Sequence, residues 1–357
     1  MCSLISFLRE VRFIVSIIGT LFRPLFATVL IGVNYDTDTC IVQVAKKRGG
    51  AIVEEMRKEF KIVNGEPSAE TIKYIKKIKT RYAYSYLAIL SKTTEQVLVP
   101  GIKKTFFPNF GVNEKEYKNI KLPNAFVFIH KDDIVRYQNT FKKANGLDLL
   151  FSPFILLFFK CKTLVSDKPK MFVLQEKESL STLIATRKET LYGSFLPINS
   201  EQPITTITDS LPESLAQANN TSSTKSAEDL DNLDTELGDL EQDLQDFDSF
   251  DFSNLETNEH LVDDSSNGEE VVSSGDSLQD LGRSTSIINL LQSCLRDFYQ
   301  NTLYDSDFIE EIVIFDCYGI SSQAIHNIRS NLMIDITLIT TDLPKEIVNL
   351  AQIELNS

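Results

Sequence analysis

An acidic segment of 85 residues, 200–284, divides this chain into two parts that have the pattern of folded protein. The segment holds 22 Asp or Glu residues and only two basic ones, Lys225 and Arg283. Because it has few apolar residues to bury, we expect it to be disordered. Residues 1–199 carry 31 Lys or Arg and 18 Asp or Glu, so this part is basic although the chain has a net charge of -14. Any core must therefore be assembled from residues before and after the acidic segment.

Inside the acidic segment, apolar residues recur at alternating spacings of three and four. They are Leu230, Leu233, Leu237, Leu240, Leu244 and Phe247. The spacing predicts one apolar face of a helix, flanked by acids and too short for a stable coiled coil on its own. Two interpretations stay open. The segment is either a solvated linker with a nascent helix, or a recognition helix that uses these residues to bind a basic partner.

Residues 1–24 predict an amphipathic helix. The apolar run 13–33 is long enough to span a membrane, but Arg23 and Pro24 lie in its middle. A central Arg costs about 2.5–3.5 kcal/mol even on the mildest insertion scale. Helical spacing of the apolar residues favours a one-sided helix instead. That helix either packs onto the protein's own core or makes a peripheral contact with an anionic membrane surface.

Residue types that hold metals or read nucleic acids are sparse. The five cysteines include no C-x-x-C pair, and the three histidines lie far apart. We therefore predict buried, reduced thiols in a reducing cytosol and no metal site. The Lys-rich stretch 73–81 has no interleaved aromatic stacking platform, so it predicts a solvated helix face and no direct binding of nucleic acid.

Apolar periodicity predicts an α/β fold in the two remaining parts. Strands are predicted over 26–45 (two strands and a turn), 51–63, 84–90, 95–100, 125–129, 171–174, 180–186, 191–197, 308–315 and 333–339. Helices are predicted from Pro67 and over 131–145, 154–159, 287–302, 321–330 and 344–350.

Taken in order, these elements resemble the actin-like (ribonuclease H-like) two-lobed fold, and in particular the PilM-type proteins of type IV pilus assembly. The cytoplasmic part of the type II secretion protein GspL is a more distant relative. The stretch IGVNYDTDTCIVQV resembles the first phosphate-loop hairpin of that family, and MFVLQEKESLSTLIATRKETLYGSFLPI resembles the second. FIEEIVIFDCYGISSQAIHNIRSNLMIDITLI resembles the terminal nucleotide-side strand, Gly turn and helix. The resemblance implies that 25–199 form lobe one and the start of lobe two, and that 285–357 complete lobe two.

The same resemblance shows where the nucleotide loops depart from the family pattern. The departures fall at Asn34, Asp36, Thr37, Gln175, Glu176 and Gly319. The first loop should offer an Asp for the metal-bound water and a Gly for close approach of phosphate, yet it has Asn34 and Asp36. A carboxylate about 5 Å from a phosphate repels it by roughly 3 kcal/mol at an effective dielectric of 20. We expect no nucleotide, metal or other cofactor, and hence a pseudo-ATPase.

By resemblance, we expect a non-catalytic scaffold that is cytoplasmic and peripheral at the inner membrane. It would belong to a type IV pilus, type II secretion or DNA-uptake (competence) apparatus and hold the cytoplasmic tail of a bitopic inner-membrane assembly protein. The alternative is an active ATPase or a metal-dependent nuclease of the same superfamily. In a nuclease, Asp36, Glu176 and Asp316 would supply the carboxylates around two metals.

Overall fold

The computed structural model describes residues 27–49, 51–101, 103–198 and 274–356. The helix predicted over 1–24 and the apolar face predicted in the acidic segment lie outside the described residues. The chain divides into a unit of residues 1–202 and 273–357 and a second unit of residues 203–272, and all described residues belong to the first. In the described part, no helix combines the length and the apolar character that crossing a bilayer requires.

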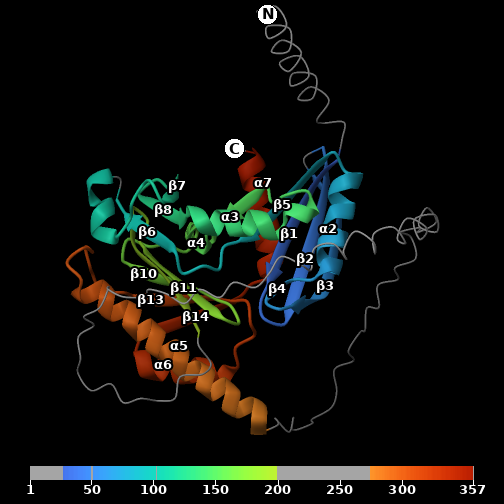
Figure 1. Cartoon of the computed structure of the whole chain (residues 1–357). Helices are drawn as coiled ribbons and strands as arrows, with labels where there is room; N and C mark the ends of the chain where they lie inside the picture. Colours follow the sequence, from blue (N-terminus) through green and yellow to red (C-terminus); the bar gives the residue numbers. More distant parts are fainter. Residues whose placement is uncertain (1–26, 50, 102, 199–273, 357) are drawn as a thin grey trace, which may run out of the picture. The chain divides into compact units, whose positions relative to one another are not determined.

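The first sheet has six strands: β1 (Thr28–Tyr35), β2 (Thr39–Arg48), β3 (Ala51–Val63), β4 (Glu66–Pro67), β5 (Tyr84–Leu90) and β9 (Leu149–Phe151). They lie in the order β4-β3-β2-β1-β5-β9, with β1, β2 and β3 antiparallel and β1, β5 and β9 parallel. Three helices pack on this sheet: α2 (Ala69–Arg81), α3 (Lys131–Thr140) and α7 (Leu343–Asn356). Helices α2 and α3 share a core with one face, and α7 packs on the other. Figure 1 shows α2 and α7 on opposite sides of β1.

The second sheet has five strands: β10 (Lys170–Gln175), β11 (Ser179–Ala185), β12 (Thr190–Pro197), β13 (Glu311–Asp316) and β14 (Asp335–Thr340). Their order is β12-β11-β10-β13-β14. Three helices pack on this sheet: α4 (Pro153–Cys161), α5 (Ser274–Gln300) and α6 (Ser322–Leu332). Helices α5 and α6 share a core with one face, and α4 packs on the other.

The two sheets repeat one arrangement of five strands. In each, three antiparallel strands lead through hairpins, and two further strands run parallel to the first. This duplicated topology is the actin-like, ribonuclease H-like two-lobed fold, which confirms the predicted fold class. We call the first sheet with α2 and α3 lobe one, and the second sheet with α5 and α6 lobe two. A third sheet is inserted into lobe one, with β6 (Gln96–Pro100), β8 (Ala125–His130) and β7 (Tyr117–Lys121) in that order.

Side-chain caps fix where several helices begin. Ser68, Ser152 and Ser321 each accept a backbone N–H of the first turn of α2, α4 and α6, as favoured N-cap residues do. The helix predicted over 131–145 ends earlier, at Thr140, and continues as a short 3-10 turn. Gly146 follows with φ +85°, a conformation that glycine adopts at little steric cost.

The last helix corrects the expectation that 285–357 lie wholly in lobe two. Helix α7 packs on β1 and buries Ile347 and Ala351 in the core between the two sheets. A Cβ on Gly32 of β1 would lie 2.6 Å from the carbonyl oxygen of Pro344. The absence of a side chain at Gly32 therefore allows α7 to approach lobe one closely.

Helix α5 begins at Ser274, before the predicted end of the acidic segment at residue 284. A contact between this helix and α6 shows why the folded part begins earlier than predicted. Ser284 is buried and accepts a hydrogen bond from the side-chain amide of Asn327 on α6 at 3.1 Å. The acidic composition of the segment hid this contact, which depends on a residue more than forty positions away.

Candidate functional site

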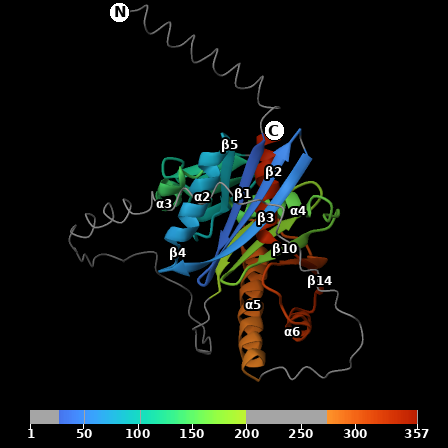
Figure 2. The same ribbon diagram turned by 90° about the vertical axis from the view of Figure 1, so that its right-hand side faces the viewer.

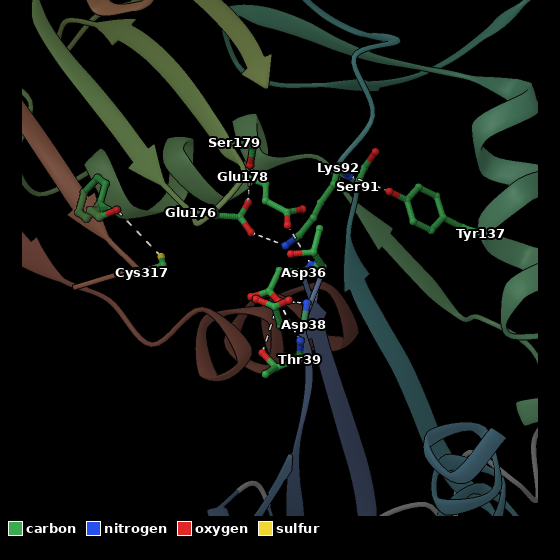
Figure 3. A network of polar contacts seen from close by, with 12 residues as sticks. Asp36, Asp38, Thr39, Ser91, Lys92, Tyr137, Glu176, Glu178, Ser179 and Cys317 are labelled. Carbon is green, nitrogen blue, oxygen red and sulfur yellow. Dashed lines mark hydrogen bonds and ion pairs between the residues drawn. The ribbon is translucent and has the colours of Figure 1, made fainter. Parts of the chain in front are cut away.

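Three connections that the sequence marked as altered nucleotide loops lie at the carboxyl ends of central strands. We call residues 36–38, between β1 and β2, loop one, and residues 176–178, between β10 and β11, loop two. Residues 317–320, between β13 and α6, form the adenosine-side turn. Strands β1 and β10 occupy equivalent positions in the two sheets, so loops one and two are equivalent parts of the two lobes. Figure 3 shows side chains of both loops pointing toward one another.

Loop one is closed by its own carboxylate. Asp36 Oδ1 accepts the backbone N–H groups of Asp38 and Thr39, both at 2.9 Å. An Asp side chain that binds the amides two and three residues later stabilises a tight turn without glycine. These amides therefore point at a carboxylate of the protein, and a phosphate would have to displace it.

Loop two reaches across to loop one. The Glu178 carboxylate accepts the backbone N–H of Thr37 at 3.0 Å. The Lys177 ammonium forms an ion pair with Asp38, and this hydrogen bond raises the pKa of Lys177. Together these contacts join the two lobes through charged side chains of both loops.

A more buried ion pair joins the lobes beside these contacts. Lys92, which follows β5, places its Nζ 2.6 Å from Glu176 Oε2. The Glu176 side chain is only 4% exposed, and its other oxygen accepts the Ser179 hydroxyl at 3.3 Å. The backbone N–H of Lys92 donates to the Tyr137 hydroxyl at 2.7 Å, which fixes the position of the lysine (Figure 3).

The adenosine-side turn is occupied in a similar way. The buried Asp316 carboxylate accepts the backbone N–H groups of Tyr318, Gly319 and Ile320 at 2.8 to 3.1 Å. Gly319 has φ +91°, which the turn requires and most side chains disfavour. The predicted Gly319 thus lies in a turn, and the Asp316 carboxylate accepts the backbone N–H groups of that turn.

Arg283 of α5 links this turn to loop two. Its guanidinium donates to the carbonyl oxygens of Glu176 and Lys177 and lies 4.1 Å from the ring centroid of Tyr318. Burial and the nearby Glu176 and Asp316 carboxylates raise the pKa of the Cys317 thiol, so this cysteine stays protonated. The Arg283 contacts and the protonated Cys317 thiol therefore support the structure, and neither provides a nucleophile.

Asn34 lies one residue before the end of β1, at the position where the resemblance implies an Asp, and Gln175 is the last residue of β10. Among the described residues, Asn34 Oδ1 and both polar atoms of the fully buried Gln175 amide have no hydrogen-bond partner. These neutral amides keep capacity to bind water inside the site. They cannot act as the anionic ligand that a metal-bound water requires.

The three carboxylates of the nuclease alternative are used separately. Asp36 closes loop one, Glu176 pairs with Lys92, and Asp316 caps the adenosine-side turn. Within the described ranges, no group of three or more His, Cys, Asp or Glu side chains is placed to hold a metal ion. The geometry therefore does not favour two-metal chemistry.

Sequence reasoning located the loops but missed the residues that pair across them, Lys92, Lys177 and Glu178. A signal existed for Lys92, because it lies two residues beyond the carboxyl end of the strand Tyr84–Leu90, where functional side chains of α/β sheets gather. Lys177 and Glu178 carried no comparable signal, since charged residues are common in hairpin turns.

Comparison with solved structures returns proteins of low sequence identity. A protein with an actin-like ATPase fold and unknown function from Bacteroides thetaiotaomicron is 8% identical over 90% of this chain and 96% of its own, with a TM-score of 0.43. A PilM-PilN type IV pilus biogenesis complex is 11% identical over 89% of each chain, with a TM-score of 0.45. The ethanolamine utilization protein EutJ from Carboxydothermus hydrogenoformans is 11% identical over 90% of this chain and 89% of its own, with a TM-score of 0.36.

Comparison with curated proteins returns no match. Two family models do match the sequence, and each is described as a domain of unknown function. DUF8569 matches residues 26–158, which include loop one and the third sheet. DUF8341 matches residues 171–356, more than half of the chain, from the second phosphate-loop hairpin to the last helix. This actin-like chain therefore belongs to the family described as domain of unknown function DUF8341.

Proposed function

We propose that this protein is a non-catalytic scaffold whose two lobes are held together by its own side chains in place of a bound nucleotide. It works at the cytoplasmic face of the inner membrane in a type IV pilus, type II secretion or DNA-uptake apparatus. There it binds the cytoplasmic tail of a bitopic membrane protein. The assignment to such an apparatus rests on the resemblance of the sequence to PilM-type proteins.

One observation carries the non-catalytic part of the proposal: the protein's own carboxylates accept the loop amides that a phosphate would need. Backbone N–H groups in tight turns are common anion sites. Here Asp36 and Glu178 accept those of loop one, and Asp316 accepts those of the adenosine-side turn. A nucleotide would have to break these hydrogen bonds before it could form its own.

Electrostatics opposes a nucleotide as well. Loops one and two contain four carboxylates, Asp36, Asp38, Glu176 and Glu178, but one lysine, Lys177. A carboxylate about 5 Å from a phosphate charge raises its energy by roughly 3 kcal/mol at an effective dielectric of 20. Lys92 offsets only part of this repulsion, because Glu176 already neutralises it at 2.6 Å.

The interlobe ion pairs provide the alternative to a nucleotide bridge. Lys92 with Glu176, and Lys177 with Asp38, each join a residue of lobe one to a residue of lobe two. Arg57 of β3 adds a third contact to Asp342, which follows β14, at 2.6 Å. A scaffold held in this way keeps one arrangement of its lobes whether or not ATP is present.

A hollow of about 230 Å³ offers a place for the membrane partner's tail. It lies between the third sheet and α3 and is lined mostly by apolar side chains of β7, β8, α3 and β9. Strand β7 forms the border of its sheet, and Ile120 of this strand is both part of the lining and exposed. An extended peptide can add to such a strand and place alternate side chains in the hollow.

The acidic segment stays a second candidate binding element. Its six apolar residues, from Leu230 to Phe247, lie outside the described residues. We propose that they bind a basic partner, because a one-sided apolar face flanked by acids fits a basic groove. We also propose that the helix predicted over residues 1–24 contacts the membrane surface, because its apolar residues are spaced to lie on one side.

A pull-down from detergent-solubilised membranes of the host tests the scaffold role. The full-length protein is immobilised with and without Mg-ATP, and captured proteins are identified by mass spectrometry. We expect a bitopic inner-membrane protein of one of these machines, in equal amounts in both conditions. Ile120→Asp should abolish its capture, and Val135→Asp, an exposed apolar position outside the hollow, should not. Capture that requires Mg-ATP, or capture of no bitopic protein, contradicts the proposal.

A further inference from the structure

The outer edge of β3 is open over most of its length (Figure 2). Strand β3 pairs with β2 along one edge, whereas β4 pairs with the other edge only at Ile62 and Val63. Among the strands that the structure describes, none pairs with the outer edge of residues 51–61. Ile52 and Val53 at its start are 41% and 56% exposed. A long open edge invites another strand, and most proteins shorten or cover such edges.

We propose that this edge pairs antiparallel with the same edge of a second copy, around a two-fold axis at Met56. Strand β4 sets the register, because it already occupies the edge beyond Lys61. A second strand must therefore stop at Lys61. Only a centre at Met56 lets residues 51–61 of both copies overlap completely, with Ala51 opposite Lys61. Such a self-complementary contact forms a closed dimer.

The backbone of β3 has the hydrogen-bonding direction that this register needs. The Ile62 N–H donates toward β2, to the carbonyl of Asp38 at 3.1 Å. Because these directions alternate along a strand, Glu55 and Arg57 present their N–H and C=O groups to the open edge. Centring on Met56 places Glu55 directly opposite Arg57 of the second copy, so both residues exchange backbone hydrogen bonds. The register shift opposite Val53 lies outside this central stretch.

Charges on the α2 side of β3 complement one another in this register. Glu54 pairs with Lys46 at 3.0 Å, and Lys58 pairs with Glu70 of α2 at 3.6 Å. In the dimer, Glu54 lies opposite Lys58 of the second copy. The four side chains then form a row of alternating charge, and the two-fold axis repeats it.

The α7 side shows the same complementarity. Glu55 lies 3.8 Å from Lys345 of α7, and Arg57 lies 2.6 Å from Asp342. Opposite each other across the axis, Glu55 and Arg57 extend these pairs into a second alternating row. A shift of the centre by one residue would instead place Glu55 against Glu55 or Arg57 against Arg57. Opposite charges on facing strands stabilise pairing, and like charges weaken it.

Sedimentation equilibrium of the full chain between 1 and about 100 µM tests this interface, a range that detects dimers of micromolar affinity. We expect a reversible dimer. Glu54→Lys and Lys58→Glu should each weaken it about tenfold or more, because like charges then face each other twice. Lys76→Glu, on the exposed side of α2, makes a matched charge change away from the edge and should leave the dimer unchanged. Thermal melts followed by circular dichroism verify that each variant is folded.

Mixing the two weakened variants provides the sharpest readout. In a mixed dimer of Glu54→Lys with Lys58→Glu, both facing pairs again carry opposite charges, so affinity should return to near the wild-type value. A wild-type protein that stays monomeric at 100 µM overturns the proposal. A dimer that ignores both substitutions, or a mixture that does not recover, overturns the interface and its register.

Discussion

Replacing Lys92 by Met should lower the free energy of unfolding by about 2–4 kcal/mol. Methionine keeps most of the alkyl chain and removes the ammonium that lies 2.6 Å from Glu176. Breaking a buried ion pair typically costs about 3–5 kcal/mol, because the remaining charge is left unpaired. The Glu176 side chain is 4% exposed, whereas Lys92 is 21% exposed and water reaches it. We therefore lower the expected cost by about 1 kcal/mol relative to that range.

Urea unfolding at pH 7 measures this effect, with an unchanged denaturant slope showing that the folded and unfolded states keep their compactness. The double variant Lys92→Met with Glu176→Gln removes both charges and should lie within about 1 kcal/mol of the wild type. Lys104→Met breaks an exposed pair with Glu114 at 3.6 Å and should change stability by less than about 1 kcal/mol. If Lys92→Met is as harmless as Lys104→Met, or if the double variant is as unstable as the single, the ion pair does not hold the lobes together.

Three further predictions address burial, packing and the boundary of the insert. Burial raises the pKa of Cys40 to about 12 and that of Cys161 to about 11, so neither thiol should react with a disulfide reagent at pH 8 until the protein unfolds. The folded state keeps these protons, whereas unfolded thiols lose theirs near pH 8.5, so the free energy of unfolding should fall as pH rises above about 8.5. Rapid labelling of both thiols in the folded protein would contradict their burial. Gly32→Ala should destabilise the protein by about 1–3 kcal/mol in urea unfolding, since the new Cβ meets the Pro344 carbonyl at 2.6 Å, and a neutral effect would mean that α7 does not approach β1 so closely. Replacing residues 203–272 by a short Gly/Ser linker should leave the melting temperature nearly unchanged. Removing residues 200–284 should lower it, because this also deletes Arg283 and Ser284 and their contacts. Equal melting temperatures for both deletions would refute the anchoring role of Arg283 and Ser284.

The elements predicted from the sequence are those whose pattern is local. The run Thr28–Tyr35 is rich in Val and Ile and bounded by Asp and Thr, and it forms β1 as expected. Strand β9 has only three residues, so periodicity alone did not predict it. Strand β7 was missed because its five residues, YKNIK, are mostly exposed at the border of a small sheet. Neither strand leaves a long apolar or alternating pattern.

Long-range relations were the part that the sequence could not supply. Nothing within residues 344–350 indicates that this helix crosses to lobe one, although Gly32 provides the space for it. The altered loops were identified from their own residues. The contacts that the replacing side chains make were not predicted. Asp36 was expected to repel phosphate or, in the nuclease alternative, to bind a metal, and the structure shows that it accepts the amides of its own loop. Pairing between Lys92 and Glu176 depends on how two sheets meet, which periodicity does not encode.

Isothermal titration of the full-length protein with Mg-ATP tests the central claim most directly. The claim is that the protein's own side chains occupy the nucleotide site, with Asp36, Glu178 and Asp316 accepting the loop amides. The account predicts no saturable heat at ligand concentrations up to about 1 mM, where even a weak complex of about -4 kcal/mol becomes detectable. Saturable binding with a micromolar dissociation constant, lost on substitution of Asp316→Ala, would contradict it.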